Sequence, residues 1–176
     1  MAEYSFSVDE LEQYKPVLKA GDRVYLSGCV YTARDAAHKR ITQTLSGGGE
    51  SPFPLKGAVI YYAGPTPAPQ GMAVGSIGPT TSGRMDVYTP LMLENGLSAM
   101  IGKGGRSSTV REKMRATGAV YFCATGGAGA LYSSCIKQLE VIAYPELGCE
   151  SVKRLTVENF PLTVGIDASG ESLFKE

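Results

Sequence analysis

Glycine and proline divide this sequence into short segments, and this punctuation constrains the fold more than any other feature. The chain of 176 residues contains 22 glycines and 10 prolines. Several of the glycines stand where a strand pattern stops and a helical pattern starts, as in mixed α/β proteins. Since 43% of the residues are hydrophobic, the chain can bury one sizeable core. We therefore predict a mixed α/β fold in a single domain over residues 1–176.

Strand-like patterns outnumber helical ones. Short runs rich in β-branched and aromatic side chains, bounded by turn residues, predict strands. They lie at residues 23–27, 57–63, 72–77, 99–101, 119–124, 139–144, 152–157 and 160–166. The last run shows the clearest alternation, with one face formed by Phe160, Leu162, Val164 and Ile166.

Helical periodicity predicts helices at residues 8–14, 33–45, 84–94, 109–117 and 129–137. Gly96 and Gly118 stand at positions where glycine commonly caps the end of a helix. Pro90 leaves two alternatives open. It either kinks the helix at 84–94, or it lies in the first turn of a shorter helix that begins after Thr89.

The charge balance excludes several classes of function. The 17 basic residues equal the 17 acidic ones, so no excess of positive charge favours nucleic acid or an anionic membrane surface. No apolar run approaches the roughly 20 residues of a membrane-spanning helix. The acidic first residues carry no secretory signal, so we expect a cytoplasmic protein.

The cysteines give no pattern for a metal site. Cys29, Cys123, Cys135 and Cys149 include no Cys-x-x-Cys pair, and the chain has one histidine. We expect no metal ligands in this chain and interpret the cysteines as buried, reduced thiols.

The predicted helix at 33–45 carries two polar side chains in line with its apolar face. Thr32 and Asp35 have the spacing of a capping box. One stripe of the helix then holds Arg34, His38, Ile41 and Leu45. A guanidinium and an imidazole in that stripe must find partners or face a polar cleft. The alternative is that Arg34 pairs with a core carboxylate and His38 is a structural histidine.

Residues 78–86 follow a predicted strand and lead into a predicted helix. Thr80, Thr81 and Ser82 offer three hydroxyls there, and Arg84 adds a planar fork of donors suited to a carboxylate. The alternative is simple polar capping beside an exposed arginine.

Two further glycine-rich turns follow predicted strands. Lys103 stands between glycines, which allow close approach of a ligand to the backbone. Residues 125–129 lack the spacing of a dinucleotide fingerprint, so we interpret them as a tight turn with close packing. Together, Arg34, Arg84 and Lys103 suit a small dicarboxylate. No metal cluster, nucleophile elbow or cofactor fingerprint accompanies them, so part of an active site is missing from this chain.

Eight blocks of sequence match a known family in the same order along nearly the whole chain. They are Leu26–Gly28, Thr32–Lys39, Tyr61–Pro65, Gly78–Asp86, Gly102–Gly104, Gly126–Ala128, Tyr144–Gly148, and Asp167 with Gly170. In these blocks the chain resembles the β subunit, or C-terminal domain, of class I iron–sulfur fumarases and L(+)-tartrate dehydratases.

This resemblance implies a swivelling β/β/α domain of three layers and a partner α subunit. The α subunit of such enzymes, and not the β subunit, binds a 4Fe-4S cluster whose open iron acts as a Lewis acid. The motif match assigns the substrate carboxylates and hydroxyl to Arg34, Thr81, Arg84 and Lys103. It assigns proton transfer to Thr80 and His38 as candidates. Thr80 needs a neighbouring group to accept its proton, and His38 could instead orient Arg34.

The resemblance favours reversible hydration of fumarate to (S)-malate, because residues 84–86 and 144–148 look more like fumarases. Three alternatives stay open. The chain could be the β subunit of an L(+)-tartrate dehydratase that forms oxaloacetate, it could act on a methyl-substituted dicarboxylate, or it could be a non-catalytic carboxylate-binding module.

Overall fold

Residues 1–174, which the computed structural model describes, form seven strands that join in one sheet. The strands are β1 (Glu3–Ser7), β2 (Arg23–Thr32), β3 (Val59–Tyr61), β4 (Ala99–Gly102), β5 (Val120–Cys123), β6 (Ile136–Ala143) and β7 (Val152–Ile166). The helices are α1 (Leu11–Tyr14), α2 (Asp35–Ser46), α3 (Thr89–Glu94), α4 (Ser108–Thr117) and α5 (Gly129–Cys135). Three short 3-10 helices are η1 (Val8–Glu10), η2 (Ser82–Met85) and η3 (Pro145–Glu150). The mixed α/β prediction is confirmed.

The sheet contains a parallel run of strands that is closed by one long antiparallel strand. The strand order is β1-β2-β3-β4-β5-β7-β6, and β1 to β5 are parallel to one another. β7 pairs antiparallel with β5 and also with β2, where Arg23 faces Thr163 and Thr32 faces Lys153. Strands β2, β3, β4, β5 and β7 therefore form a closed ring, because β7 pairs with both β5 and β2. β1 pairs with β2 and β6 pairs with β7 outside this ring.

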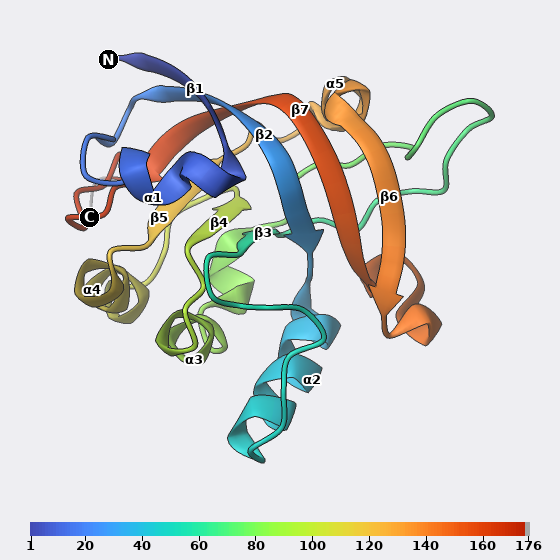
Figure 1. The fold of residues 1–176 in the computed structure, drawn as a ribbon, viewed down its shortest axis with the longest axis horizontal. Coiled ribbons are helices and arrows are strands. Elements are labelled where there is room, and N and C mark those ends of the chain that lie inside the picture. Colours follow the sequence, from blue (N-terminus) through green and yellow to red (C-terminus); the bar gives the residue numbers. More distant parts are fainter. Residues whose placement is uncertain (175–176) are drawn as a thin grey trace.

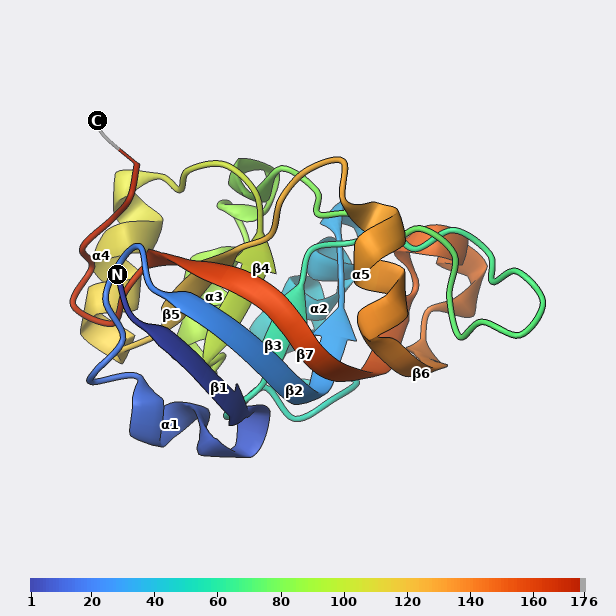
Figure 2. The same ribbon diagram turned by 90° about the horizontal axis from the view of Figure 1, so that it is seen from above.

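The helices and strands lie in layers (Figure 1). Helices α2, α3 and α4 lie on one side of β3, β4 and β5, and the long strands β2 and β7 lie on the other side. The view from above (Figure 2) shows β1, β2 and β7 in front of these helices. One apolar core, with Val24, Leu26 and Phe160, lies within the strands. A second core, with Ile41, Met100 and Met114, packs the helices on the sheet.

Helix boundaries settle two questions that the sequence raised. α3 begins at Thr89 with Pro90 in its first turn, so the shorter helix is the correct alternative. The predicted capping box at the start of α2 is wrong. Thr32 is the last residue of β2, and its buried Oγ1 has no hydrogen-bond partner among residues 1–174. The N-cap residue of α2 is Arg34, whose side chain makes no capping bond.

The strand predictions are mostly confirmed, with three differences. The runs at 152–157 and 160–166 form one strand, β7, which is bent at Asn159, where φ is 50°. β1 is an additional strand that the sequence pattern does not mark. Residues 72–77, all within the described part of the chain, form no strand. Residues 72–76 belong to the projecting arm 64–76, which closes on itself because the amide of Thr66 donates to the carbonyl of Ser76 at 2.9 Å.

The helices of residues 1–174 are too short and too polar to cross a lipid bilayer.

Candidate active site

The predicted site residues lie at one edge of the sheet, beyond the carboxyl ends of its parallel strands. β2, β3 and β4 are parallel neighbours, so their carboxyl ends meet there. Arg34 lies just beyond the end of β2, and Lys103 directly follows β4. In parallel α/β sheets, ligands commonly bind outside the carboxyl ends of the strands. We therefore take this edge as the candidate active site.

Residues 78–86, here called the threonine loop, run along the end of β4. Thr81 forms a parallel bridge with Lys103, and the amide of Lys103 donates to the carbonyl of Thr80 at 3.3 Å. The amide of Thr80 donates to the carbonyl of Tyr62, just beyond β3, at 2.7 Å. The structure therefore brings Thr80, Thr81 and Lys103 together on adjoining backbone segments.

Arg84 connects the threonine loop to the start of α2. Its Nε lies 3.1 Å from Oδ1 of Asp35, and its Nη2 lies 2.9 Å from Oδ2 of the same carboxylate. The side chain of Arg84 is 51% exposed, so the guanidinium remains accessible to a ligand. Because Asp35 follows Arg34 in the chain, this ion pair holds the two arginines at the same edge.

Arg34 lies between a glycine and a carboxylate. Its Nε is 3.8 Å from Oε1 of Glu150, the last residue of η3. A Cβ atom at Gly64 would lie 2.9 Å from Nη1 of Arg34. The missing side chain at Gly64 thus lets the guanidinium lie against the backbone that follows β3.

Lys103 packs against the turn after β5. A Cβ atom at Gly126 would lie 3.6 Å from the ammonium nitrogen of Lys103. The same turn leads into α5, where a Cβ atom at Gly129 would lie 2.2 Å from Oγ of Ser76 and 2.9 Å from the amide nitrogen of Gly78. The predicted tight turn with close packing at 125–129 is confirmed.

His38 lies beneath the site and has no exposed surface. Its Nδ1 is 2.9 Å from the carbonyl oxygen of Arg34, so Nδ1 carries the proton of the neutral ring. Nε2 is buried and has no hydrogen-bond partner within the described chain. The ring packs edge-on against Tyr62, with centroids 5.3 Å apart. Burial lowers the pKa of His38 to about 4, so the ring is neutral at pH 7.

Two charged residues that support this site are not predicted from the sequence. Glu150 is the carboxylate neighbour of Arg34, although 116 positions separate them. Arg106 lies three positions after Lys103, and its side chain is fully buried against Asp86 at the end of the threonine loop. The local sequence around these two residues does not identify their partners, which only tertiary structure reveals.

The cysteines do not form a metal-binding set. Within residues 1–174, no group of three or more cysteine, histidine or acidic side chains is placed to hold a metal ion. The interpretation of all four cysteines as buried is wrong, because Cys29 and Cys149 are exposed and the other two are partly exposed. The side chains of the described residues therefore do not fit an iron–sulfur cluster, which needs several thiolates in one place.

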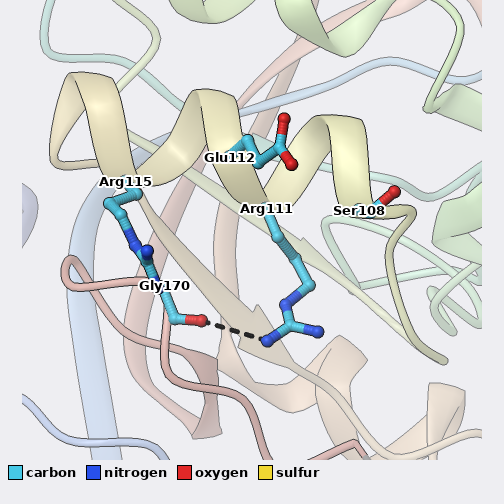
Figure 3. A pocket seen from close by; sticks show the side chains of 5 residues that line it. All are labelled: Ser108, Arg111, Glu112, Arg115 and Gly170. Atoms are coloured by element: carbon cyan, nitrogen blue, oxygen red, sulfur yellow. Dashed lines mark hydrogen bonds between the residues drawn. The ribbon is translucent and has the colours of Figure 1, made fainter. Parts of the chain in front are cut away.

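A separate hollow of about 190 Å³ lies along α4 (Figure 3). It contains none of the predicted site residues. Arg111 donates there to the carbonyl of Gly170 at 3.4 Å, and Arg115 donates to the carbonyl of Ser169 at 2.9 Å. These arginines hold the turn that follows β7 against α4, which is a structural arrangement.

Comparison with known proteins identifies relatives along nearly the whole chain. A family model described as the fumarase C-terminus matches residues 5–176. Fumarate hydratase 2 of Leishmania major is 38% identical over 171 residues, and the anaerobic class I fumarate hydratase of Escherichia coli K12 is 40% identical over 169 residues. These alignments cover 96% and 95% of this chain but only 30% of either relative, so the chain spans less than a third of their length.

A shorter relative matches end to end. The putative L(+)-tartrate dehydratase subunit beta of Methanocaldococcus jannaschii is 39% identical over 180 residues. The alignment covers 99% of this chain and 92% of that protein. The alignment thus spans nearly the full length of both sequences.

Proposed function

This chain belongs to the fumarase C-terminal family, and we propose that it is the β subunit of a class I fumarate hydratase, which reversibly hydrates fumarate to (S)-malate. The observation that carries the proposal is the meeting of Thr81, Arg84 and Lys103 at the sheet edge where Arg34 begins α2. Three cations and neighbouring hydroxyls suit a small ligand with two carboxylates.

The arginines bind the substrate carboxylates in this proposal. Asp35 already takes the edge of the Arg84 guanidinium formed by Nε and Nη2. A substrate carboxylate therefore uses the other edge of that guanidinium or displaces Asp35. Arg34 has a looser partner, because 3.8 Å between its Nε and Glu150 is too long for a hydrogen bond. Its donors are the easier ones to redirect to a ligand.

Proton transfer has two candidate residues in this chain, Thr80 and His38. Thr80 lies at the edge with Lys103, but an alcohol can act as a base only when a neighbouring group accepts its proton. His38 stays the second candidate. Its burial, low pKa and bond to the carbonyl of Arg34 support a role in orienting Arg34 instead.

The proposed complex requires a partner. The fumarate hydratases that resemble this chain are more than three times its length, and one relative of nearly the same length is called a subunit beta. We propose an α subunit that binds the 4Fe-4S cluster, because this chain offers no ligand set for it over residues 1–174. The domain would swivel toward that subunit. The closed ladder with α2, α3 and α4 on one side supports the proposed β/β/α class.

L(+)-tartrate dehydratase is a second candidate function. The relative that matches over 92% of its own length carries that name. Gly83 lies in the threonine loop beside Arg84, where the additional hydroxyl of tartrate would need space, and a Cβ atom there would meet nothing within 4 Å. The two candidates differ only in substrate, so direct assay separates them.

Anaerobic reconstitution tests the proposal. The purified chain is mixed with a cluster-loaded α subunit, and turnover of fumarate, tartrate and a methyl-substituted dicarboxylate such as mesaconate is measured. We expect the highest kcat/KM for fumarate, and no turnover by either subunit alone. Higher kcat/KM for tartrate would favour the second candidate. Carboxylate binding without turnover of any substrate would favour the non-catalytic module.

A further inference from the structure

Arg106 is a fully buried arginine directly behind the candidate active site. Its Nε donates to Oδ1 of Asp86 at 2.7 Å, and its Nη2 donates to Oγ1 of Thr89 at 2.8 Å. The other carboxylate oxygen of Asp86 accepts from the amide of Ser107 at 2.7 Å. Asp86 ends the threonine loop, and Arg106 belongs to residues 103–107, here called the lysine segment. The ion pair therefore ties the two site segments together from the buried side.

Two tyrosine rings fix the plane of this guanidinium. The Cζ atom of Arg106 lies 5.3 Å from the ring centroid of Tyr62 and 5.2 Å from that of Tyr121. Both distances are within the range of cation–π attraction. The oxygen acceptors on Asp86 and Thr89 fix the position of the guanidinium, and the two rings fix its plane.

Tyr121 adds a second connection between the same segments. Its hydroxyl donates to the carbonyl of Gly104 at 2.8 Å, in the lysine segment. The same oxygen lies 2.8 Å from Oγ of Ser82, in the threonine loop. Since the single phenol proton is used at Gly104, Ser82 is the donor to Tyr121. Apart from the contacts of Arg106 with Thr89 and with Sδ of Met100, the side-chain hydrogen bonds of Arg106 and Tyr121 connect the threonine loop to the lysine segment.

We propose that Arg106 is a positioning residue that sets the distance between Lys103 and the groups of the threonine loop, Thr81 and Arg84. This inference rests on the proposed function for its effect on turnover, but not for the contacts themselves. A misplacement of about 1 Å in a reacting complex can cost on the order of 100-fold in rate. A lysine at this position keeps the charge but loses the fork that reaches Asp86 and Thr89 together.

The competing explanation is that Arg106 only stabilises the fold. A buried ion pair is weak evidence for stability, because apolar residues of similar volume often stabilise as well or better. The two explanations differ in where the effect of a substitution is felt. If Arg106 positions the site, its substitution should speed amide exchange in the threonine loop and the lysine segment alone. If Arg106 has a general structural role, exchange should speed up throughout the domain.

Amide hydrogen exchange on the full chain separates the two explanations without any assay of activity. In Arg106→Lys we expect exchange to accelerate roughly tenfold or more at the amides of Ser82, Lys103 and Ser107, which bond across or within the two segments. Amides of β2 and β7 should keep their protection. Arg154→Lys is the matched control, because Arg154 pairs with Glu140 on the distant β6. Uniform acceleration, or none, would overturn the inference.

Kinetics of the assembled enzyme complete the test. We expect Arg106→Lys to lower kcat/KM for fumarate on the order of 100-fold while thermal unfolding stays cooperative. Wild-type turnover in both variants, despite loosened segments in Arg106→Lys, would overturn positioning. If the wild type shows no turnover but the variant shows faster exchange in the two segments, the proposed function is wrong. The role of Arg106 in holding the two segments together would then still stand. If Arg106→Lys does not fold, Asp86→Asn, which keeps the shape of Asp86, provides the same measurements.

Discussion

Nε of Arg84 donates a hydrogen bond to Oδ1 of Asp35 at 3.1 Å, and Nη2 lies 2.9 Å from Oδ2, a close ion-pair contact without hydrogen-bond geometry. Arg34, the residue before Asp35, has its own carboxylate neighbour in Glu150. Each arginine of the candidate site therefore already has an acidic partner, which offsets part of the repulsion between them. A dicarboxylate that binds here competes with these partners, so recognition is an exchange of carboxylates.

Replacement of Arg84 by alanine should damage function far more than stability. The pair with Asp35 is half exposed, and such pairs contribute less than about 1 kcal/mol to folding. Loss of a two-point carboxylate contact should lower kcat/KM for fumarate roughly 100-fold or more. Thermal unfolding and steady-state kinetics of the reconstituted enzyme measure both effects. Arg154→Ala, which removes a similarly exposed pair with Glu140, is the control. A large fall in melting temperature with normal activity of the folded fraction would make Arg84 structural.

Addition of a methyl group at Gly64 should move Arg34 and leave the fold intact. The new Cβ would lie 2.9 Å from Nη1 of Arg34, at the far end of a flexible side chain, and 3.2 Å from the backbone oxygen of Cys149, which needs only a small shift. We expect substrate affinity of Gly64→Ala to fall about tenfold to a hundredfold, the usual effect of losing a hydrogen bond to a charged group. Gly47→Ala, with ordinary contacts at 3.5 Å at the end of α2, serves as the control. Equal KM values in both variants would remove Arg34 from the binding site.

The sequence predicts the buried strands well because their hydrophobic pattern depends on burial alone. All residues of β4 are buried and nearly all of β5, and both appear as short apolar runs. β1 has one buried residue, Phe6, and so carries no comparable signal. Residues 72–77 contribute Val74 and Ile77 to the same core, yet they form no strand, because the backbone at Gly75 and Ser76 bonds to Thr66 instead. Apolar composition alone does not distinguish these two cases.

The residues of the candidate site also differ in how well the sequence predicts them. Thr81, Arg84 and Lys103 stand in glycine-containing turns after strands, and Arg34 directly follows a strand, so their sequence context indicates their position. Arg106 shares the glycine-rich turn of Lys103, but the sequence does not identify its partner or that of Glu150, because tertiary packing alone defines the neighbours of a partly or fully buried charge. The capping interpretation of Thr32 fails for a related reason. β2 continues to Thr32 because its ladder with β7 extends to Lys153, and this pairing overrides the local preference for a cap.

Gly102 is required by the close approach of the threonine loop to β4. A Cβ atom at this position would lie 1.9 Å from Oγ of Ser82 and 2.9 Å from Cδ2 of Tyr62. We expect Gly102→Ala to lower the free energy of unfolding by about 1–3 kcal/mol, as overpacked cores do. Urea unfolding measures this difference. The double variant Gly102→Ala with Ser82→Ala should recover part of the loss, because the contact with Oγ is removed and the costs are then not additive. Full additivity would mean that the loop moves aside freely.

His38 should make the stability of the protein depend on pH. The unfolded chain protonates this histidine below about pH 6.5, whereas burial lowers the pKa in the folded protein to about 4. Arg106 also lowers this pKa, while the Arg34 carbonyl and Asp35 raise it. Between these pH values the unfolded state binds more protons, so the free energy of unfolding falls as the pH falls.

A substitution of His38 isolates this contribution from those of the carboxylates. From pH 6.5 to pH 4, the wild type should lose about 3 kcal/mol more stability than His38→Gln, at about 1.4 kcal/mol per unit of pKa shift. Glutamine keeps a donor for the carbonyl of Arg34 but does not titrate, which makes it the suitable comparison. Urea unfolding of both proteins at several pH values gives the difference. Parallel curves would show that the His38 imidazole reaches solvent in the folded protein, and would then strengthen its candidacy for proton transfer at the expense of a role in orienting Arg34.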